Sequence, residues 1–225
     1  MSDSDNTLWL QLWREHRIAF HQEAVNPLLA RFWPALRVTR HNRVFVPLCG
    51  KSLDMIWLAK CGHDVIGVEL SPVAVRAFFN ENHLYPTRRE TGDFTMWHAG
   101  RITILCGDYF ALQPQDLGHI DTVYDRAALT ALPAHIRAAY IAQLRRIVPD
   151  TANVFLLTVE DAQAGDSRQK RMGIDREVGA LYAADFEIEL AHVESLYETH
   201  PDVLDHAAKP VEYKVYRLQG KKSHV

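Results

Sequence analysis

The 225-residue sequence has few of the features that mark specialised classes of protein. It contains three cysteines, Cys49, Cys61 and Cys106, whose spacing favours neither a disulfide framework nor a thiolate metal site. No apolar run approaches the roughly 20 residues that span a bilayer, and the N-terminus carries acids where a signal peptide has bases. We therefore predict a cytoplasmic protein in a reducing compartment, with no membrane association.

An excess of positive charge is also lacking. The formal net charge is -3, the pI is about 6.4, and the only tight basic run is the tail from Gly220 to His224, so nucleic acid is not an expected partner. The twelve histidines are scattered and include no HExxH pair, so we predict no metal site. Nothing in the sequence requires more than a monomer.

The composition that remains is that of an ordinary globular protein, with 48% hydrophobic and 24% charged residues. Residues 1–225 are predicted to form a single domain, with a helical N-terminal segment at 1–40 and a Rossmann-like core at 41–225. In the segment, Trp9 and Trp13 lie four residues apart on a predicted helix, and Asn26 with Pro27 begins a second helix. A tryptophan pair at this spacing most often belongs to a core.

Apolar runs then alternate with helical patterns. Uninterrupted runs of this kind are typical of a mostly parallel sheet buried on both faces, so we predict a doubly wound α/β fold. The pattern between Asp93 and Cys106 predicts a hairpin that turns at His98 to Arg101. The predicted strands lie at 43–47, 64–70, 93–106 (hairpin), 121–125, 153–159, 186–193 and 211–218, and the core helices at 52–61, 71–82, 133–148 and 174–184.

The tripeptide Gly50, Lys51, Ser52 also closes the phosphate-binding loop of many ATPases. That loop needs an earlier glycine and free backbone amides to hold the phosphates. Here Phe45 stands at the glycine position, and Pro47 removes an amide donor. The sequence therefore argues against nucleotide hydrolysis.

Glu69 ends the second predicted strand, at about the distance where doubly wound folds place an acid that accepts hydrogen bonds from ribose hydroxyls. The loop before it has one glycine, whereas a dinucleotide site wants three for a pyrophosphate. An adenosine without phosphates fits better, and we predict S-adenosylmethionine as the cofactor. A dehydrogenase is disfavoured on the same glycine count.

Asp108 and Asp125 also follow core strands. Each acid alone could be a turn residue, a helix cap or an ion-pair partner, but three acids at successive strand ends are predicted to converge on the ligand-binding edge of the sheet. Cys49 and Cys106 have no base nearby in the sequence, so we predict packing rather than covalent catalysis.

The strings "FHQEAVNPLL", "VFVPLCGKSLDMIWLAKCGHDVIGVELS" and "YDRAAL" resemble the bacterial thiopurine S-methyltransferases, from about Leu8 to Val159. The resemblance implies a class I methyltransferase with a seven-stranded sheet and an N-terminal helical lid. It also implies transfer of a methyl group from S-adenosylmethionine to small thiols such as thiopurines, or to selenium or tellurium species.

Carried over by position, the resemblance implies a set of site residues. Arg126 would hold the acceptor thiolate, although in isolation it could be a surface ion-pair partner. The implied cofactor contacts are Trp13, Leu48, Gly50, Glu69, Asp108, Tyr109 and Arg126, and the implied substrate contacts are Trp9 and Phe20.

The resemblance weakens after Val159. Members of the family usually carry a Gly-Pro-Pro-Phe stretch there, whereas this chain has "EDAQAGDSRQKRMGID". Drift of an exposed loop is the simpler interpretation. The alternative is an acceptor site altered by Arg168, Lys170 or Arg171 toward a more anionic substrate.

Other functions remain open on the sequence alone. Methylation of nucleic-acid amino groups is disfavoured, since the fourth strand ends in "DRAAL" rather than in an Asn/Asp-Pro-Pro-aromatic motif. A methyltransferase for another small molecule, and a protein that binds S-adenosylmethionine without turnover, are the alternatives.

Overall fold

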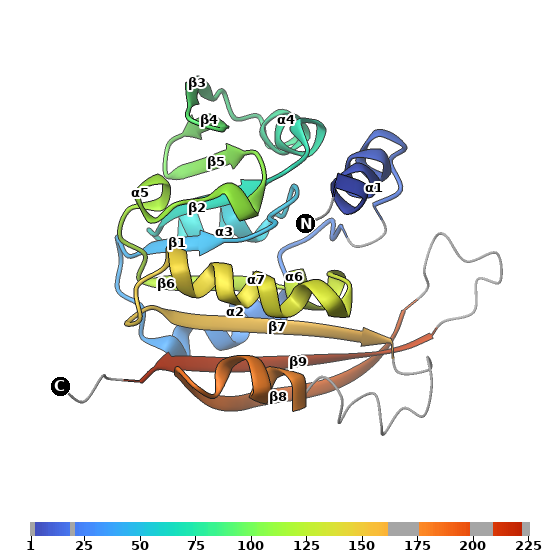
Figure 1. Ribbon diagram of the computed structural model, residues 1–225, viewed down its shortest axis with the longest axis vertical. Helices are drawn as coiled ribbons and strands as arrows, with labels where there is room; N and C mark the ends of the chain where they lie inside the picture. Colours follow the sequence, from blue (N-terminus) through green and yellow to red (C-terminus); the bar gives the residue numbers. More distant parts are fainter. Residues whose placement is uncertain (1–2, 19–20, 162–175, 199–208, 222–225) are drawn as a thin grey trace.

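The computed structural model describes residues 3–18, 21–161, 176–198 and 209–221, and one nine-stranded sheet runs through it (Figure 1). The strand order is β3-β4-β5-β2-β1-β6-β7-β9-β8. The strands are β1 (Arg43–Val46), β2 (Asp64–Glu69), β3 (Thr87–Thr91), β4 (Phe94–Ala99), β5 (Ile102–Cys106), β6 (Thr122–Arg126), β7 (Asn153–Asp161), β8 (Phe186–Glu198) and β9 (Lys209–Gly220).

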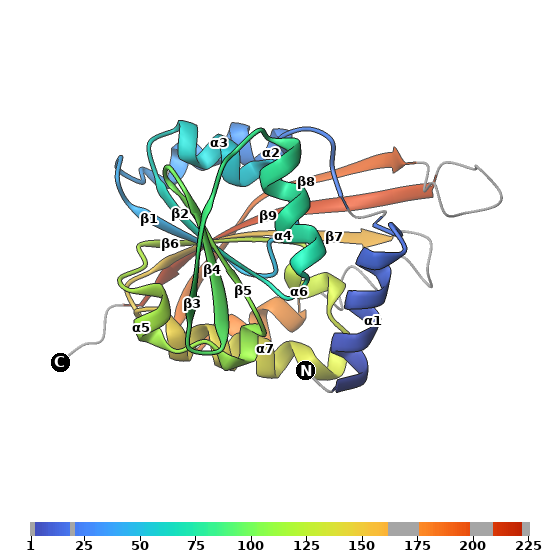
Figure 2. The same ribbon diagram turned by 90° about the horizontal axis from the view of Figure 1, so that it is seen from above.

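Helices cover both faces of this sheet. Seen from above, α2, α3 and α4 lie over one face and α5, α6 and α7 over the other (Figure 2). Each face has its own cluster of buried apolar side chains, so the doubly wound α/β prediction is confirmed. The helices are α1 (Asp3–Arg14), α2 (Pro27–Phe32), α3 (Asp54–Lys60), α4 (Pro72–Glu81), α5 (Pro114–Leu117), α6 (Ala128–Ala131) and α7 (Ala134–Ile147), with 3-10 turns η1 (Trp33–Leu36) and η2 (Tyr109–Ala111) and a helix described over residues 176–182.

The prediction of a seven-stranded, mostly parallel sheet is wrong, because the sheet that the structure describes has nine strands and is mixed. Five neighbouring strands, β5-β2-β1-β6-β7, are parallel, whereas β4 and β3 on one side and β9 and β8 on the other are joined by antiparallel pairing. The predicted hairpin is present as β4 and β5. Strand β3 was not predicted, because this edge strand is polar and mostly exposed and so lacks an apolar pattern.

The capping residues and prolines seen in the sequence mark where α2 and α4 begin. The Asn26 side chain accepts hydrogen bonds from the amides of Leu28 and Leu29, and Ser71 caps α4 by accepting one from Ala74. Pro27 and Pro72 occupy the first helical positions as predicted. No helix among the described residues is long and apolar enough to cross a membrane.

Asp54, at the start of α3, fastens the N-terminal segment to the core. Its carboxylate is buried, and one oxygen accepts a hydrogen bond from the amide of Asn26 at 2.8 Å. The other oxygen accepts one from the hydroxyl of Tyr124, on β6, also at 2.8 Å. One side chain thus ties together α2, α3 and the centre of the sheet.

We expect Asp54→Ala to lower the free energy of unfolding by about 3 kcal/mol, because two buried donors lose their acceptor. Urea unfolding would measure this. The matched control is Asp64→Ala, which removes an exposed ion pair with Arg101 at 2.7 Å and should cost less than about 1 kcal/mol. Similar losses in the two variants would contradict the role given to Asp54.

Candidate cofactor and acceptor site

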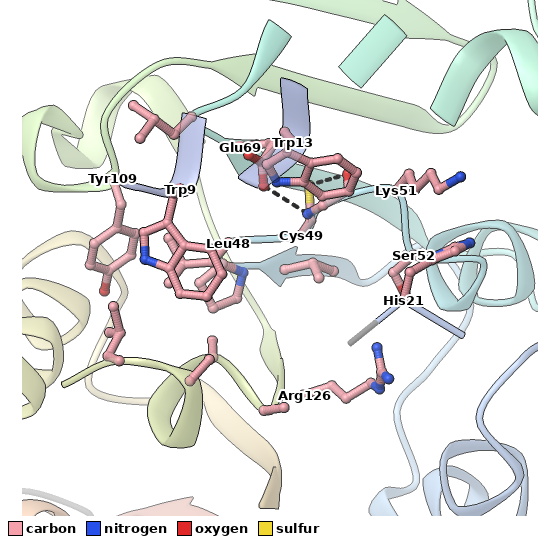
Figure 3. Close-up of a pocket in the computed structure, with 18 of the residues that line it drawn as sticks. Trp9, Trp13, His21, Leu48, Cys49, Lys51, Ser52, Glu69, Tyr109 and Arg126 are labelled. Carbon is pink, nitrogen blue, oxygen red and sulfur yellow. Dashed lines mark hydrogen bonds between the residues drawn. The ribbon is translucent and has the colours of Figure 1, made fainter. Parts of the chain in front are cut away.

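A pocket opens at the carboxyl ends of β1, β2, β5 and β6, where α1 lies across it (Figures 1 and 3). Such strand ends are where open parallel sheets bind ligands. The pocket holds about 1040 Å³ of space, part of it open to solvent. Its lining includes Asn6, Trp9, Trp13, His21, Leu48, Cys49, Gly50, Lys51, Ser52, Glu69, Asp108, Tyr109, Tyr124, Arg126, Ala127 and Leu132.

Glu69 is the most constrained acid in this pocket. One carboxylate oxygen accepts a hydrogen bond from the amide of Gly50 at 2.9 Å, and the other accepts one from the amide of Ser71 at 2.7 Å. Burial raises the pKa of Glu69 to about 7, although these amide bonds act to lower it. The carboxylate is therefore held in one orientation, and each oxygen has a further lone pair.

The loop after β1 wraps around this carboxylate. Leu48 and Gly50 both have a positive φ, at 47° and 54°. In this region the backbone of any residue other than glycine is strained. A Cβ on Gly50 would lie 3.2 Å from Cζ2 of Trp13, so the missing side chain lets the indole rest on the backbone. The Cys49 thiol is buried, and burial raises its pKa well above the usual value, as expected of a packing residue rather than a nucleophile.

Asp108 and Tyr109 form the wall after β5. Asp108 accepts hydrogen bonds from the amide of Phe110 at 2.9 Å and from the side-chain amide of Asn6, on α1, at 3.0 Å. The Tyr109 hydroxyl donates to the carbonyl of Tyr140 at 3.0 Å, so its ring is the part that faces the pocket.

Asp125 does not join this edge, which corrects the prediction that three acids converge there. One of its oxygens accepts hydrogen bonds from the amides of Ala128 and Leu129, and the other accepts one from the Tyr140 hydroxyl at 2.8 Å. Burial raises its pKa to about 6, against the lowering effect of those bonds. Asp125 therefore caps α6 from inside the core, and two predicted acids, Glu69 and Asp108, line the pocket.

Basic groups gather on the opposite side of the pocket. Figure 3 shows Arg126, His21 and Lys51 on the side away from Tyr109 and Trp9. Both oxygens of Glu81, at the end of α4, accept hydrogen bonds from the Lys51 ammonium at 2.8 Å. The pocket thus has an acidic end at Glu69 and Asp108 and a basic end at Arg126.

The structure brings most of the predicted site residues together. Within the described part of the chain it places the following in one pocket: Trp9, Trp13, Leu48, Gly50, Glu69, Asp108, Tyr109 and Arg126. Phe20 lies outside the described residues, as do Arg168, Lys170 and Arg171. No group of three or more His, Cys, Asp or Glu side chains among the described residues could hold a metal ion.

Sequence reasoning missed several polar residues of the lining, among them Asn6, His21 and Lys51. Asn6 gave no signal. Lys51 was seen only as part of the misleading Gly-Lys-Ser tripeptide. His21 lies inside the string "FHQEAVNPLL", which singled it out as part of a motif without showing that it faces the pocket.

Two comparisons with known structures show the fold. A SAM-dependent methyltransferase from Anabaena variabilis ATCC 29413 superposes with a TM-score of 0.64 at 15% identity, over 96% of this chain and 95% of the other. The magnesium protoporphyrin IX methyltransferase (ChlM) from Synechocystis PCC 6803 with bound SAH superposes with a TM-score of 0.60 at 16% identity, over 94% and 99%. The chain therefore has the fold of S-adenosylmethionine-dependent methyltransferases.

Comparisons of the sequence identify the family as well as the fold. A "Thiopurine S-methyltransferase" from Stutzerimonas stutzeri (strain A1501) is 65% identical over 222 residues, which cover 99% of this chain and 94% of the relative. Another from Bordetella petrii is 42% identical over 96% of this chain and 98% of the relative. The family model "Thiopurine S-methyltransferase (TPMT)" matches residues 4–221. The chain therefore belongs to the thiopurine S-methyltransferase family.

Proposed function

We propose that this protein transfers a methyl group from S-adenosylmethionine to the sulfur of small thiols such as thiopurines. The observation that carries the proposal is a single pocket with a fixed carboxylate at one end and an arginine at the other. The names of its relatives point to the same acceptors.

The residues of the acidic end fit the adenosine of the cofactor. Glu69 already has one amide donor on each oxygen, and its remaining lone pairs suit the two ribose hydroxyls. Trp13, Leu48 and Gly50 supply an apolar wall and a close backbone surface around it. Asp108 and the ring of Tyr109 lie where they can contact the adenine.

The residues of the basic end suit an anionic sulfur. The cofactor supplies a methyl group made electrophilic by its sulfonium, so the protein needs to position the acceptor and exclude water. Arg126 presents a planar, permanently charged fork that can hold a thiolate or the delocalised negative charge of a thiopurine. Trp9 and Phe20 are proposed as aromatic contacts of the acceptor, with Trp9 reaching it from the side of Tyr109 (Figure 3).

The proposal also covers methyl acceptors other than thiols. Small selenium and tellurium species share the soft, polarisable nucleophile of thiols, so we include them and a role in detoxification in the proposal. The alternatives are methylation of another small molecule and binding of S-adenosylmethionine without turnover.

Isothermal titration with S-adenosylhomocysteine, followed by methyl-transfer assays against 6-mercaptopurine and selenite, tests the proposal. Binding together with transfer to 6-mercaptopurine is the expected result. Binding without transfer to either acceptor would leave a different methyltransferase or a non-catalytic binder, and absence of binding would remove the role proposed for the pocket.

Arg126→Lys should lower kcat/KM for 6-mercaptopurine by about 100-fold, because a forked planar donor becomes a point charge. Cofactor affinity should change much less. The matched control is Arg145→Lys on α7, where the arginine pairs with Asp185 and is 44% exposed. Unchanged kinetics in Arg126→Lys would end the assignment of this residue.

Cofactor binding should weaken in acid. The pKa of free Glu69 is raised to about 7, and ribose hydroxyls donate to the ionised carboxylate, so the complex favours the charged form. Affinity for S-adenosylhomocysteine should be flat above about pH 7 and fall by up to about tenfold per pH unit below it. Titrations between about pH 5.5 and about pH 8 would show this.

Glu69→Gln provides the control for that pH dependence. It should bind about 10- to 100-fold more weakly at about pH 8, because a charged acceptor is lost. Its affinity should also be nearly independent of pH over the same range. A wild-type affinity that does not change between about pH 5.5 and about pH 8 would contradict the role of Glu69.

We further propose that α1 acts as a lid. It contributes Trp9 and Trp13 to the pocket, and Asn6 holds the Asp108 carboxylate that an adenine would approach. Closing over a bound cofactor would exclude water from the reacting sulfur. Amide hydrogen exchange across α1 should slow by at least about tenfold when S-adenosylhomocysteine binds, while α7 serves as an internal control. Equal protection of α1 in both states would count against a lid.

A further inference from the structure

His21 stands at the basic end of the pocket without a role in the function proposed so far. It lies in the connection between α1 and α2 and lines the same pocket as Glu69 and Arg126. Figure 3 shows His21 on the same side of the pocket as Arg126. Within the part of the chain that the structure describes, the imidazole makes no hydrogen bond, and only the backbone amide of His21 is bonded, to the carbonyl of Ile18 at 2.9 Å. Among the described residues, nothing else binds either ring nitrogen, so both are open to a ligand there.

Several charged groups act on this imidazole. They are Lys51 from the loop after β1, Glu81 from the end of α4, Arg126 from the end of β6, and Glu23 from its own segment. Burial lowers the pKa of His21, and the charges of Lys51 and Arg126 lower it further, while Glu81 and Glu23 oppose the shift. The ring is consequently neutral near pH 7 and keeps a lone pair that can accept a proton.

We propose that His21 is the general base that removes the proton of the acceptor thiol. The S–H bond breaks, the proton moves to an imidazole nitrogen, and the electron pair remains on the sulfur. That sulfur then bonds to the methyl carbon as the bond between this carbon and the sulfonium breaks, leaving its electron pair on the sulfur of S-adenosylhomocysteine. The imidazolium finally releases its proton to water. The inference rests on the proposed S-methyl transfer.

The neighbouring cations suit this step in two ways. Arg126 can stabilise the thiolate as it forms, which offsets the modest basicity of a histidine with a lowered pKa. Lys51 and Arg126 also disfavour an imidazolium, so the proton leaves readily once the sulfur has reacted. Lys51 is itself fixed by Glu81, and this arrangement keeps the positive charge in place.

General-base catalysis makes a distinctive prediction. A thiol that is already ionised needs no base, whereas a thiol that is protonated at the working pH depends on one. Phenylmethanethiol, an alkyl thiol, is mostly protonated near pH 7. 4-Nitrothiophenol has a similar size, and its electron-withdrawing ring leaves it ionised. A base should therefore accelerate the first acceptor and leave the second nearly unaffected.

The test compares His21→Gln with wild type on these two acceptors. We expect kcat/KM to fall by about 100-fold for phenylmethanethiol and by less than about threefold for 4-nitrothiophenol. Added imidazole should restore activity toward phenylmethanethiol in His21→Ala. The matched control is His119→Gln, which replaces a histidine whose side chain is 70% exposed and should behave as wild type.

The pH profile gives a second measurement. With phenylmethanethiol, kcat/KM of wild type should level off above the lowered pKa of His21, whereas in His21→Gln it should keep rising toward the pKa of the thiol itself. Equal losses on both acceptors would show that His21 only positions the substrate or the segment, and no loss on either would show that it is not the base. If wild type methylates neither thiol, the S-methyl transfer fails and the inference falls with it. If wild type methylates only 4-nitrothiophenol, the transfer stands and a base at His21 is refuted.

Discussion

The site depends on one buried carboxylate held between two loops. Burying the Glu69 carboxylate is costly, and the structure offsets that cost with hydrogen bonds from the amides of Gly50 and Ser71. These amides belong to the loop after β1 and to the start of α4, so Glu69 fixes the two walls of the pocket relative to each other. A further close contact supports the same geometry: a Cβ on Gly67 would lie 2.7 Å from the Cys49 sulfur, so glycine is what lets the loop pack against β2.

Another part of the pocket wall comes from the segment before the first strand. Trp9, Trp13 and His21 line the pocket from this segment, and Asp54 ties its far end to the core through Asn26 and Tyr124. Glu69 and Arg126 therefore lie at the edge of the sheet, whereas Trp9, Trp13 and His21 belong to a segment laid across it. In the proposed lid movement, Trp9 and Trp13 would move while Glu69 stays in place.

Much of this arrangement could be predicted from the sequence, for identifiable physical reasons. Strand ends, caps and the acid that ends β2 follow local rules, and Asn26, Ser71 and Glu69 stand where those rules place them. The residues whose place was predicted wrongly are those whose role depends on partners far away in the sequence. Asp125 looks the same as Asp108 in sequence, yet Tyr140 and the start of α6 turn it into the core. The exposed edge strand β3 lacks an apolar pattern and could not be recognised.

The two ends of the pocket also match the charge balance of the proposed reaction. A thiolate and a sulfonium neutralise each other as the methyl group moves, so charge is lost on the way to the transition state. Water would stabilise the separated charges more than that transition state, which makes its exclusion by Trp9 and Trp13 favourable. Arg126 and Lys51 increase the ionised fraction of a bound thiol, but they also stabilise the reactant anion. A base that is neutral before the reaction adds no third positive charge to the pocket until it takes the thiol proton, and the cations beside the imidazolium then favour release of that proton once the sulfur has reacted.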